Sequence, residues 1–208
     1  MDFVPLSAAQ RRAIDSDGFL VVPQALDADA VALLTAASDR LMSAFLDDPE
    51  QVYLQLRQGL VQEPDLDSLV AHAKTVPLVV QLLSPNIHLH STSIIYKKSR
   101  DAAALSAPER GWHRDIGIAE DLGHQGLPRL GIKVCYCLSD FSAPASGMTL
   151  LAPGSHINGE PLGIRAREVD PPEVADIRVR AGDAVFFENR VFHSAPPNLS
   201  DRVSRMIT

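Results

Sequence analysis

The amino-acid sequence predicts an α+β fold, in which a double-stranded β-helix (a jelly-roll or cupin-type barrel) is supported by a layer of N-terminal helices. Residues up to about 86 carry helical patterns and one strand, whereas residues from about 87 to 208 carry many short strand patterns. Helices followed by a run of short strands are typical of this class of fold. The chain of 208 residues contains no internal repeat or low-complexity tract, so we expect a single domain over 1–208.

The helical part begins at a capping-box pair, Ser7 and Gln10, which predicts a helix over 8–16. The next elements are predicted from apolar spacing and from turn residues. They are a strand over 19–22 after Asp17-Gly18, a helix from Asp27 or Asp29 to about 46, and a helical region over about 67–83 that is interrupted near Pro77.

The barrel part is predicted from β-branched and alternating segments, of which 130–138 alternates most clearly. This segment contains the two cysteines of the chain, Cys135 and Cys137, which a strand places on one face. A C-x-C pair without further cysteines is no zinc site, so we interpret both as reduced structural thiols. The other predicted elements are strands over 87–97 and 148–151, a hairpin of 177–180 with 184–187, and a last strand from about 202.

Charge and composition argue against two classes of partner. The formal net charge is −7 and no dense block of Lys and Arg is present, which argues against a nucleic-acid surface. No apolar run approaches the length of a membrane span, and residues 1–5 lack the pattern of a signal peptide. We therefore expect a cytoplasmic protein without nucleic-acid or membrane partners. The sequence makes no prediction of the oligomeric state.

The segment Gly111-Trp112-His113-Arg114-Asp115-Ile116 contains the strongest candidate site. His113 and Asp115 are two residues apart, so an extended strand places both side chains on the same face. A third ligand is available in His193, which follows the apolar run 184–187. Two histidines and one carboxylate are the ligand set of non-haem Fe(II) oxygenases. Alone, a His-x-Asp pair is weak evidence, and the alternative is a surface histidine beside a solvated aspartate.

Further blocks of sequence accompany this segment. They are Leu138-Ser139-Asp140-Phe141, Ser146-Gly147-Met148, Ala152-Pro153-Gly154-Ser155-His156, Ala181-Gly182-Asp183 and the run from His193 to Arg202. In order and spacing, these blocks resemble the phytanoyl-CoA dioxygenase family of Fe(II)- and 2-oxoglutarate-dependent oxygenases. The resemblance extends from about Asp17 to the end of the chain, and bacterial hydroxylases that tailor natural products look most similar.

By that resemblance, His113, Asp115 and His193 are the ligands of Fe(II), while 2-oxoglutarate and O2 are the cosubstrates. The implied reaction hydroxylates an unactivated C–H bond of a small organic molecule in secondary metabolism, with succinate and CO2 as co-products. Related halogenases replace the carboxylate ligand by a small residue, so the presence of Asp115 favours hydroxylation over halogenation.

The arginine that binds the far carboxylate of 2-oxoglutarate in this family is missing from its usual position, which falls on Ser204. A carboxylate is bound well by an arginine that makes paired hydrogen bonds. A one-residue bulge would bring Arg205 into place, and strand alternation puts Arg202 on the same face as position 204. Both arginines are candidates, and loss of 2-oxoglutarate dependence is the alternative.

Other cosubstrate contacts are expected from neighbouring strands. Tyr136 falls where the family often has an aromatic residue beside the cosubstrate, and the alternative is a core tyrosine. Thr92 and Ser93, on the strand before the His-x-Asp pair, are candidates for hydrogen bonds to 2-oxoglutarate. Lys97, at the end of the same strand, is expected to be solvated.

The remaining polar residues near these motifs have structural alternatives. His88 and His90 share a predicted strand face, but no carboxylate follows at a suitable spacing, so we interpret them as structural or pocket-lining. The other residues weighed are His72, His124 and His156, interpreted as structural; Trp112 and Arg114, at the substrate mouth or shielding the site; and Arg110 and Arg129, expected in surface ion pairs.

Two other functions share these residues. One is an iron enzyme of the same fold that performs desaturation, epimerisation or ring formation, and the other is a non-catalytic cupin-like binding protein that retains the ligand triad. The identity of the substrate is carried by loops, over 98–110, 116–128 and 161–174, for which no sequence code exists.

Overall fold

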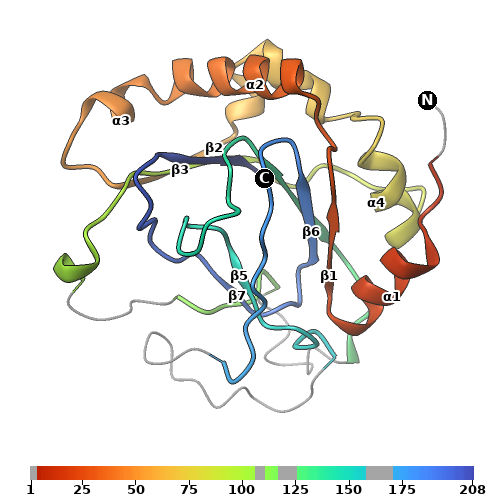
Figure 1. Cartoon of the computed structure of the whole chain (residues 1–208). Coiled ribbons are helices and arrows are strands. Elements are labelled where there is room, and N and C mark those ends of the chain that lie inside the picture. Colours follow the sequence, from red (N-terminus) through yellow and green to blue (C-terminus); the bar gives the residue numbers. More distant parts are fainter. Residues whose placement is uncertain (1–3, 106–110, 117–125, 158–170) are drawn as a thin grey trace.

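The computed structural model describes residues 4–105, 111–116, 126–157 and 171–208. They form a mixed α/β structure, in which helices cover one face of a six-stranded sheet and a two-stranded pair lies on the other side (Figure 1). In the part of the chain that the structure describes, all pairs of strands are antiparallel. The α-helices are α1 (Ala8–Ser16), α2 (Ala28–Leu41), α3 (Ser43–Asp47) and α4 (Val76–Leu82), with 3-10 turns at Gly59–Val61, Pro64–Leu69 and Ala102–Ala104.

The large sheet has the strand order β1-β6-β4-β8-β3-β2, and β5 pairs with β7. Strands that are distant in the sequence are therefore neighbours, as β3 and β8 are. The strands are β1 (Phe19–Val22), β2 (Tyr53–Arg57), β3 (Ser93–Lys97), β4 (Ile132–Cys137), β5 (Leu150–Leu151), β6 (Ala184–Glu188), β7 (His193–Ser194) and β8 (Ser204–Ile207).

Strand alternation gives the large sheet two faces with separate apolar clusters. The outer face packs against the helices, and its cluster contains Ile94, Tyr96, Tyr136, Phe186 and Ile207 together with Leu34 and Phe45. The opposite face, which we call the inner face, meets β5. Its cluster contains Cys135, Cys137, Val185, Phe187 and Met206 together with Leu151. Alternate residues along a strand therefore point to the helices on the outer face or to the second cluster on the inner face.

The predicted starts of the first two helices are confirmed. The Ser7 side chain accepts a hydrogen bond from the Gln10 N–H, and the Gln10 side chain accepts one from the Ser7 N–H, so the capping box of α1 is complete. The carboxylate of Asp27 caps α2 by accepting one hydrogen bond from the N–H of Ala30. The strands predicted over 19–22 and 130–138 are present as β1 and β4. Cys135 and Cys137 are free and buried on the inner face.

Three expectations for the N-terminal part are wrong. The helix expected to reach residue 46 is divided at Met42, and only Val76–Leu82 of the region 67–83 is α-helical. Pro77 lies in the first turn of α4, where its missing N–H needs no partner, so it starts this helix instead of interrupting it. β2 is a strand inside the region expected to be helical. The alternation of apolar and polar residues in Tyr-Leu-Gln-Leu-Arg was the feature from which this strand could have been predicted.

Two expectations for the C-terminal part are also wrong. The strand predicted over 87–97 begins only at Ser93, and residues 87–91 are exposed. The hairpin of 177–180 with 184–187 does not form, because β6 already has β1 on one edge and β4 on the other. The carbonyl of Val179 instead accepts a hydrogen bond from the N–H of Phe141.

None of the helices in the described parts of the chain combines the length and the apolar character that crossing a membrane requires.

Gly182 offers a test of backbone strain in the turn before β6. Its φ is +94°, and a Cβ there would lie 2.6 Å from the carbonyl oxygen of Leu26, which belongs to the turn before α2. We expect Gly182→Ala to lower the free energy of unfolding by about 1–3 kcal/mol, measured by urea denaturation. Gly126→Ala is the control, because nothing lies within 4 Å of a Cβ at that position. Equal losses in the two variants would contradict this account.

Candidate metal centre

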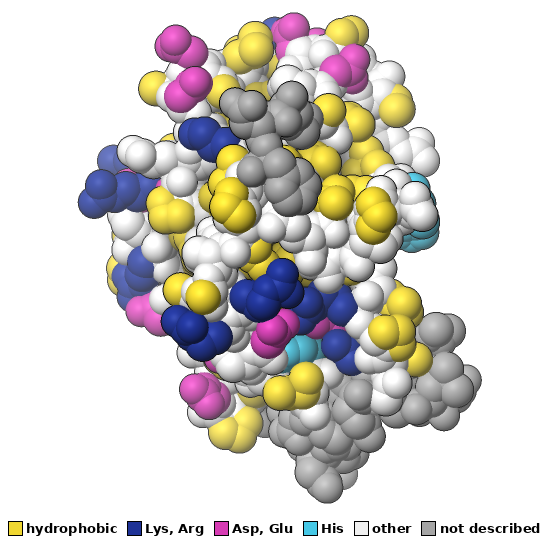
Figure 2. Space-filling model, turned by 90° about the vertical axis from the view of Figure 1, so that its right-hand side faces the viewer, with side chains coloured by type: hydrophobic (Ala, Val, Ile, Leu, Met, Phe, Trp, Pro, Cys, Tyr) yellow, Lys and Arg dark blue, Asp and Glu magenta, His cyan; other side chains and the backbone are white. Residues whose placement is uncertain are grey.

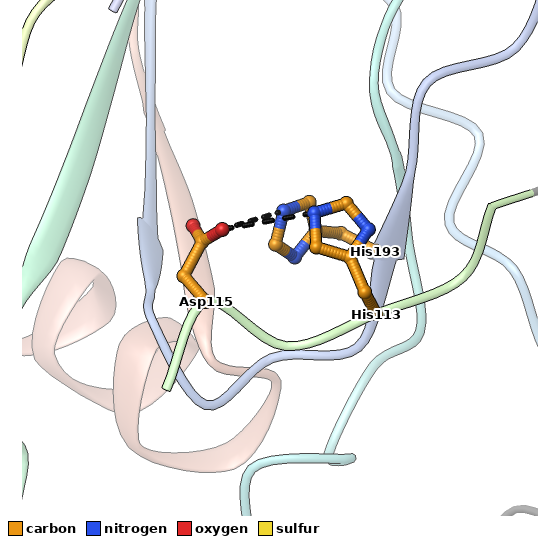
Figure 3. A group of neighbouring side chains, drawn as sticks. All are labelled: His113, Asp115 and His193. Atoms are coloured by element: carbon orange, nitrogen blue, oxygen red, sulfur yellow. Dashed lines mark ion pairs between the residues drawn. The ribbon is translucent and has the colours of Figure 1, made fainter. Parts of the chain in front are cut away.

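The side chains of His113, Asp115 and His193 converge on one point, as Figure 3 shows. Nε2 of His113 lies 3.7 Å from Oδ1 of Asp115, and Nε2 of His193 lies 3.6 Å from the same oxygen. One potential ligand atom from each side chain lies within 4.8 Å of the others. The fold therefore brings the three predicted residues together from two distant segments of the chain.

Backbone hydrogen bonds hold the segment of His113 against β7. The N–H of His113 donates to the carbonyl of His193 at 2.9 Å, and the N–H of His193 donates to the carbonyl of His113 at 2.9 Å. The N–H of Asp115 donates to the carbonyl of Asn189 at 3.0 Å. Because all three residues are bonded through their backbones, the spacing of their side chains is set by the main chain.

Trp112 and Arg114 alternate with the ligand candidates and anchor the same segment from its other side. The Trp112 ring is buried and stacks on Phe192, with centroids 5.6 Å apart. The guanidinium of Arg114 lies 5.0 Å from the same ring and donates to the carbonyls of Arg190 and Ser155. These contacts keep both side chains away from the point at which the triad meets.

Each histidine presents its Nε2 to Asp115. Nδ1 of His113 lies 2.7 Å from the carbonyl oxygen of Gly111, and Nδ1 of His193 lies 2.9 Å from that of Val191. A carbonyl oxygen only accepts, so in the neutral imidazole the proton is on Nδ1 and the lone pair is on Nε2. A hydrogen bond of this kind orients a metal-binding imidazole. No motif in the sequence indicated these two bonds.

The charges of the triad suit metal binding. Burial lowers the pKa of His193 to about 4, although the charge of Asp115 opposes that shift. Burial alone would raise the pKa of Asp115, but the charges of His193, Lys133 and His113 outweigh it and hold this pKa below its ordinary value. At neutral pH the buried imidazole is therefore neutral and the carboxylate is ionised. These are the protonation states in which both groups bind a metal ion.

Lys133 is a site residue that the sequence analysis missed. Its Nζ lies 2.6 Å from Oδ2 of Asp115, whereas Oδ1 of the same carboxylate faces the histidines. Lys133 precedes Cys135 by two residues on β4, so alternation places its side chain on the inner face. The two-residue spacing between Lys133 and Cys135 was the feature of the sequence from which this position could have been predicted.

A buried ion-pair cluster supports the turn between β6 and β7. Glu188 is fully buried and pairs with Arg190 and with Arg129, whose Nε lies 3.0 Å away. Arg129 also reaches Asp15 on α1 at 2.7 Å, which confirms its expected ion pair. On the side of the molecule that carries α1, Figure 2 shows Lys and Arg side chains gathered beside acidic ones. Arg110, for which a surface pair was also expected, lies outside the described residues.

The two arginines expected to bind the cosubstrate do not lie at the triad. Arg205 is on the outer face, where its Nε lies 3.0 Å from Asp39 of α2 and its guanidinium lies 5.3 Å from the Tyr96 ring. The β3–β8 ladder is regular through Tyr96 and Arg205, so the expected bulge is absent. Arg202 precedes β8, with 79% of its side chain exposed beside Asp201. The structure therefore places Arg205 on the outer face and Arg202 at an exposed position, and their binding of 2-oxoglutarate stays an untested prediction.

Tyr136 is the core tyrosine of the alternative interpretation. It lies on the outer face, with its hydroxyl 2.5 Å from Oγ1 of Thr75 and its ring against His72. Ser93 is buried at the start of β3, and its hydroxyl accepts a hydrogen bond from Nε2 of Gln55 at 2.9 Å. Thr92 lies just before β3 and is half-buried. Of these three candidates, Tyr136 has its side chain on the outer face of the sheet, which is the face opposite the inner cluster.

The other histidines do not form a second centre in the described part of the chain. His88 and His90 are exposed, with ring centroids 6.1 Å apart, and the triad is the one group of three or more potential ligands found there. Nδ1 of His72 lies 3.3 Å from Oγ1 of Thr75, and Nε2 of His156 lies 3.2 Å from the carbonyl of Asp15. His124 lies outside the described residues.

One protein with a similar sequence is a known dioxygenase. The ectoine dioxygenase of Sphingopyxis alaskensis is 28% identical to the chain over 163 residues, which cover 73% of this chain and 50% of that protein. The chain therefore spans half the length of this relative.

Two solved structures have a similar fold. SnoK, a non-heme alpha ketoglutarate dependent carbocyclase from nogalamycin biosynthesis, has a TM-score of 0.72 at 22% identity and covers 97% of this chain and 82% of its own. HygX from Streptomyces hygroscopicus, solved with nickel and 2-oxoglutarate bound, has a TM-score of 0.75 at 18% identity and covers 97% and 85%. At sequence identities of 22% and 18%, these two similarities show that the chain shares the fold of SnoK and HygX, and no more.

The family is shown by a sequence model that matches almost the whole chain. The model is that of phytanoyl-CoA dioxygenase (PhyH), and it matches residues 14–207. This range includes every element from the end of α1 to β8, and all three residues of the triad. The protein therefore belongs to the phytanoyl-CoA dioxygenase family.

Proposed function

We propose that this chain is an Fe(II)- and 2-oxoglutarate-dependent oxygenase that hydroxylates an unactivated C–H bond of a small organic molecule. His113, Asp115 and His193 would hold the iron. The observation that carries the proposal is the arrangement of the donors: two Nε2 atoms face one carboxylate oxygen, and both Nδ1 atoms are bonded to carbonyls. Rings fixed in this way are ready to bind a metal ion without reorientation.

The donor set fits the cofactors that the phytanoyl-CoA dioxygenase family uses, which are Fe(II), 2-oxoglutarate and O2. Two imidazoles and one carboxylate suit a non-haem iron that keeps open positions for exchangeable ligands. When bound, iron and 2-oxoglutarate together supply the activation of O2, and succinate and CO2 are the co-products. Asp115 would supply the third protein ligand of the iron, which favours hydroxylation over halogenation.

The residues of the chain also determine how the site is approached. His193 is buried, and its ring packs on Phe187 with centroids 4.8 Å apart, whereas 54% of the His113 side chain is exposed. A small-molecule substrate would therefore enter from the side of His113. The buried ring of His193 and the apolar inner cluster would keep water from the opposite side.

The proposal includes the architecture of the domain. We infer that the two antiparallel sheets are the halves of a double-stranded β-helix within one domain over 1–208. The inner cluster supports this inference, because it joins Cys135 of the large sheet to Leu151 of the small one. A cytoplasmic role in secondary metabolism completes the proposed function.

Iron and cosubstrate binding are tested together by spectroscopy. When 2-oxoglutarate is titrated into the anaerobic Fe(II)-loaded protein, we expect a saturable visible charge-transfer band, because a 2-oxo acid chelates the iron. His193→Ala should abolish this band and lower the Fe(II) affinity by about 100-fold or more. His90→Ala, at an exposed histidine, is the matched control and should change neither quantity. Iron binding without the band would support the binding-protein alternative.

Lys133 is expected to position Asp115 for the metal. Lys133→Met should lower the Fe(II) affinity by about 10–100-fold, because the hydrogen bond to Oδ2 that orients the carboxylate is lost. The measurement is a competition titration against a chromogenic chelator. Lys74→Met is the control, since the Nζ of Lys74 donates to the exposed carbonyl of Gln24. An equal affinity in wild type and Lys133→Met would contradict the positioning role.

The outcome of the reaction is tested by mass spectrometry of the product once a substrate is identified. Hydroxylation adds an oxygen atom to the substrate, desaturation and ring formation remove two hydrogen atoms, and epimerisation leaves the mass unchanged. We expect the added oxygen atom. The loss of two hydrogen atoms, or a changed product of unchanged mass, would favour the iron enzyme of the same fold that performs desaturation, ring formation or epimerisation, with the same metal site.

A further inference from the structure

Lys97 is buried, contrary to the expectation of a solvated lysine at the end of its strand. It is 3% exposed, and burial lowers the pKa of its ammonium group to about 7. Its Nζ donates to the carbonyl of Gly147 at 2.7 Å and to that of Pro196 at 2.9 Å. Neither group carries a charge, and no carboxylate in the described part of the chain forms an ion pair with this lysine.

A buried lysine without a counter-ion calls for an explanation, because lysines are rarely buried unless they are paired. An ammonium group has three N–H donors, and the two carbonyls satisfy two of them. The third donor has no acceptor among the described residues. In its protonated form Lys97 therefore carries an unpaired charge and one unused hydrogen-bond donor, which suit an anion that is not part of the chain.

The position of Lys97 matches the place where a cation is missing. In the β3–β8 ladder Lys97 is the direct partner of Ser204, the position at which an arginine is expected in this family. Gly147, whose carbonyl accepts from Lys97, also adjoins Ser204: a Cβ on this glycine would lie 3.1 Å from the serine Oγ. The ammonium group of Lys97 thus lies in the neighbourhood of Ser204.

Lys97 is on the same face of the sheet as the triad. Ile95, two residues earlier on β3, packs against the inner cluster, and strand alternation places Lys97 on that face. The inner cluster includes Phe187, whose ring lies 4.8 Å from the ring of His193. The lysine and the triad therefore share one side of the large sheet.

The electrostatic surroundings of Cys135 agree with this placement. Burial raises the pKa of its thiol to about 12, and the charges of Lys133, Asp115 and Lys97 also act on it. Cys135 is on the inner face of β4, next to β8 in the sheet. A carboxylate of the triad and the ammonium group of Lys97 are thus both close enough to influence one buried thiol.

We propose that Lys97 binds the far carboxylate of 2-oxoglutarate and takes the place of the arginine that is absent at position 204. The proposal rests on the proposed function and deepens it by assigning the cosubstrate contact for which Arg202 and Arg205 were the sequence candidates. Arg202 and Arg205 face other surroundings, and Lys133 is already paired with Asp115. A bound carboxylate would give Lys97 its missing counter-charge and third acceptor.

The test compares two ligands that differ only in the carboxylate at issue. 2-Oxoglutarate and 2-oxobutyrate both carry the 2-oxo acid group that chelates a metal, but 2-oxobutyrate lacks the far carboxylate. Their dissociation constants are measured by calorimetry with the Ni(II)-loaded protein, which avoids turnover. The decisive quantity is the ratio of the two constants, because the fraction of correctly folded protein affects both constants alike.

For wild type we expect 2-oxoglutarate to bind about 10–100-fold more tightly than 2-oxobutyrate, as a hydrogen bond to a charged group provides. Two variants remove the charge: Lys97→Met keeps an unbranched side chain that is one atom shorter, and Lys97→Gln keeps N–H donors for the two carbonyls. In both we expect the preference to disappear through weaker 2-oxoglutarate binding, with 2-oxobutyrate binding unchanged. Lys98→Met is the matched control, because the Nζ of Lys98 donates to the backbone carbonyls of Phe45 and Asp48 on the helical side. This variant should keep the preference for 2-oxoglutarate.

The outcomes separate the two proposals. If wild type prefers 2-oxoglutarate and the Lys97 variants keep that preference, the assignment of Lys97 is overturned while the oxygenase proposal stands. Equal binding of both ligands by wild type also overturns it, since no cation then senses the far carboxylate. If metal-loaded wild type binds neither ligand, the oxygenase proposal fails and the lysine assignment fails with it.

Discussion

The reciprocal backbone hydrogen bonds between His113 and His193 are the constraint on which the candidate site depends. They join the segment of His113 to the short strand β7, and so place two imidazoles with ring centroids 4.2 Å apart. The Trp112–Phe192 stack and the bond from Asp115 to Asn189 hold the same segment at two more points. Several weak contacts of this kind can replace a long strand, because each one fixes a different residue of the loop.

Local patterns in the sequence predicted what depends on short stretches of chain. The capping box of α1, the alternation of β4 and the His-x-Asp spacing each span only a few residues, and the structure contains all of them. The predictions were wrong where the structure of a segment depends on which strand it pairs with. The segment 177–180 has strand-like residues, but β6 has no free edge to offer it. Competition for a strand edge involves β1 and β4, which no window around this segment contains.

The candidate site shows the same division. The triad follows from spacing and residue type, whereas the surroundings of Arg205, Lys97 and Lys133 depend on what covers each face of the sheet. Arg205 is one residue from Ser204, and this single step takes it to the outer face and to Asp39. Lys97 is buried because the loops that carry Gly147 and Pro196 cover it. Both loops are distant in the sequence, so a strand-end lysine gave no indication of its burial.

The register of Lys97 opposite Ser204 has a consequence for the divergence of such sheets. Partners across a ladder occupy neighbouring points in space although they are far apart in the chain. A charge can therefore pass from one strand to its neighbour by two substitutions, while its position relative to a bound ligand changes little. Related sequences compared along the chain would show the loss of a residue at one position. Compared across the paired strands, this chain has a lysine opposite the serine, and that lysine would retain the charge if it binds the far carboxylate.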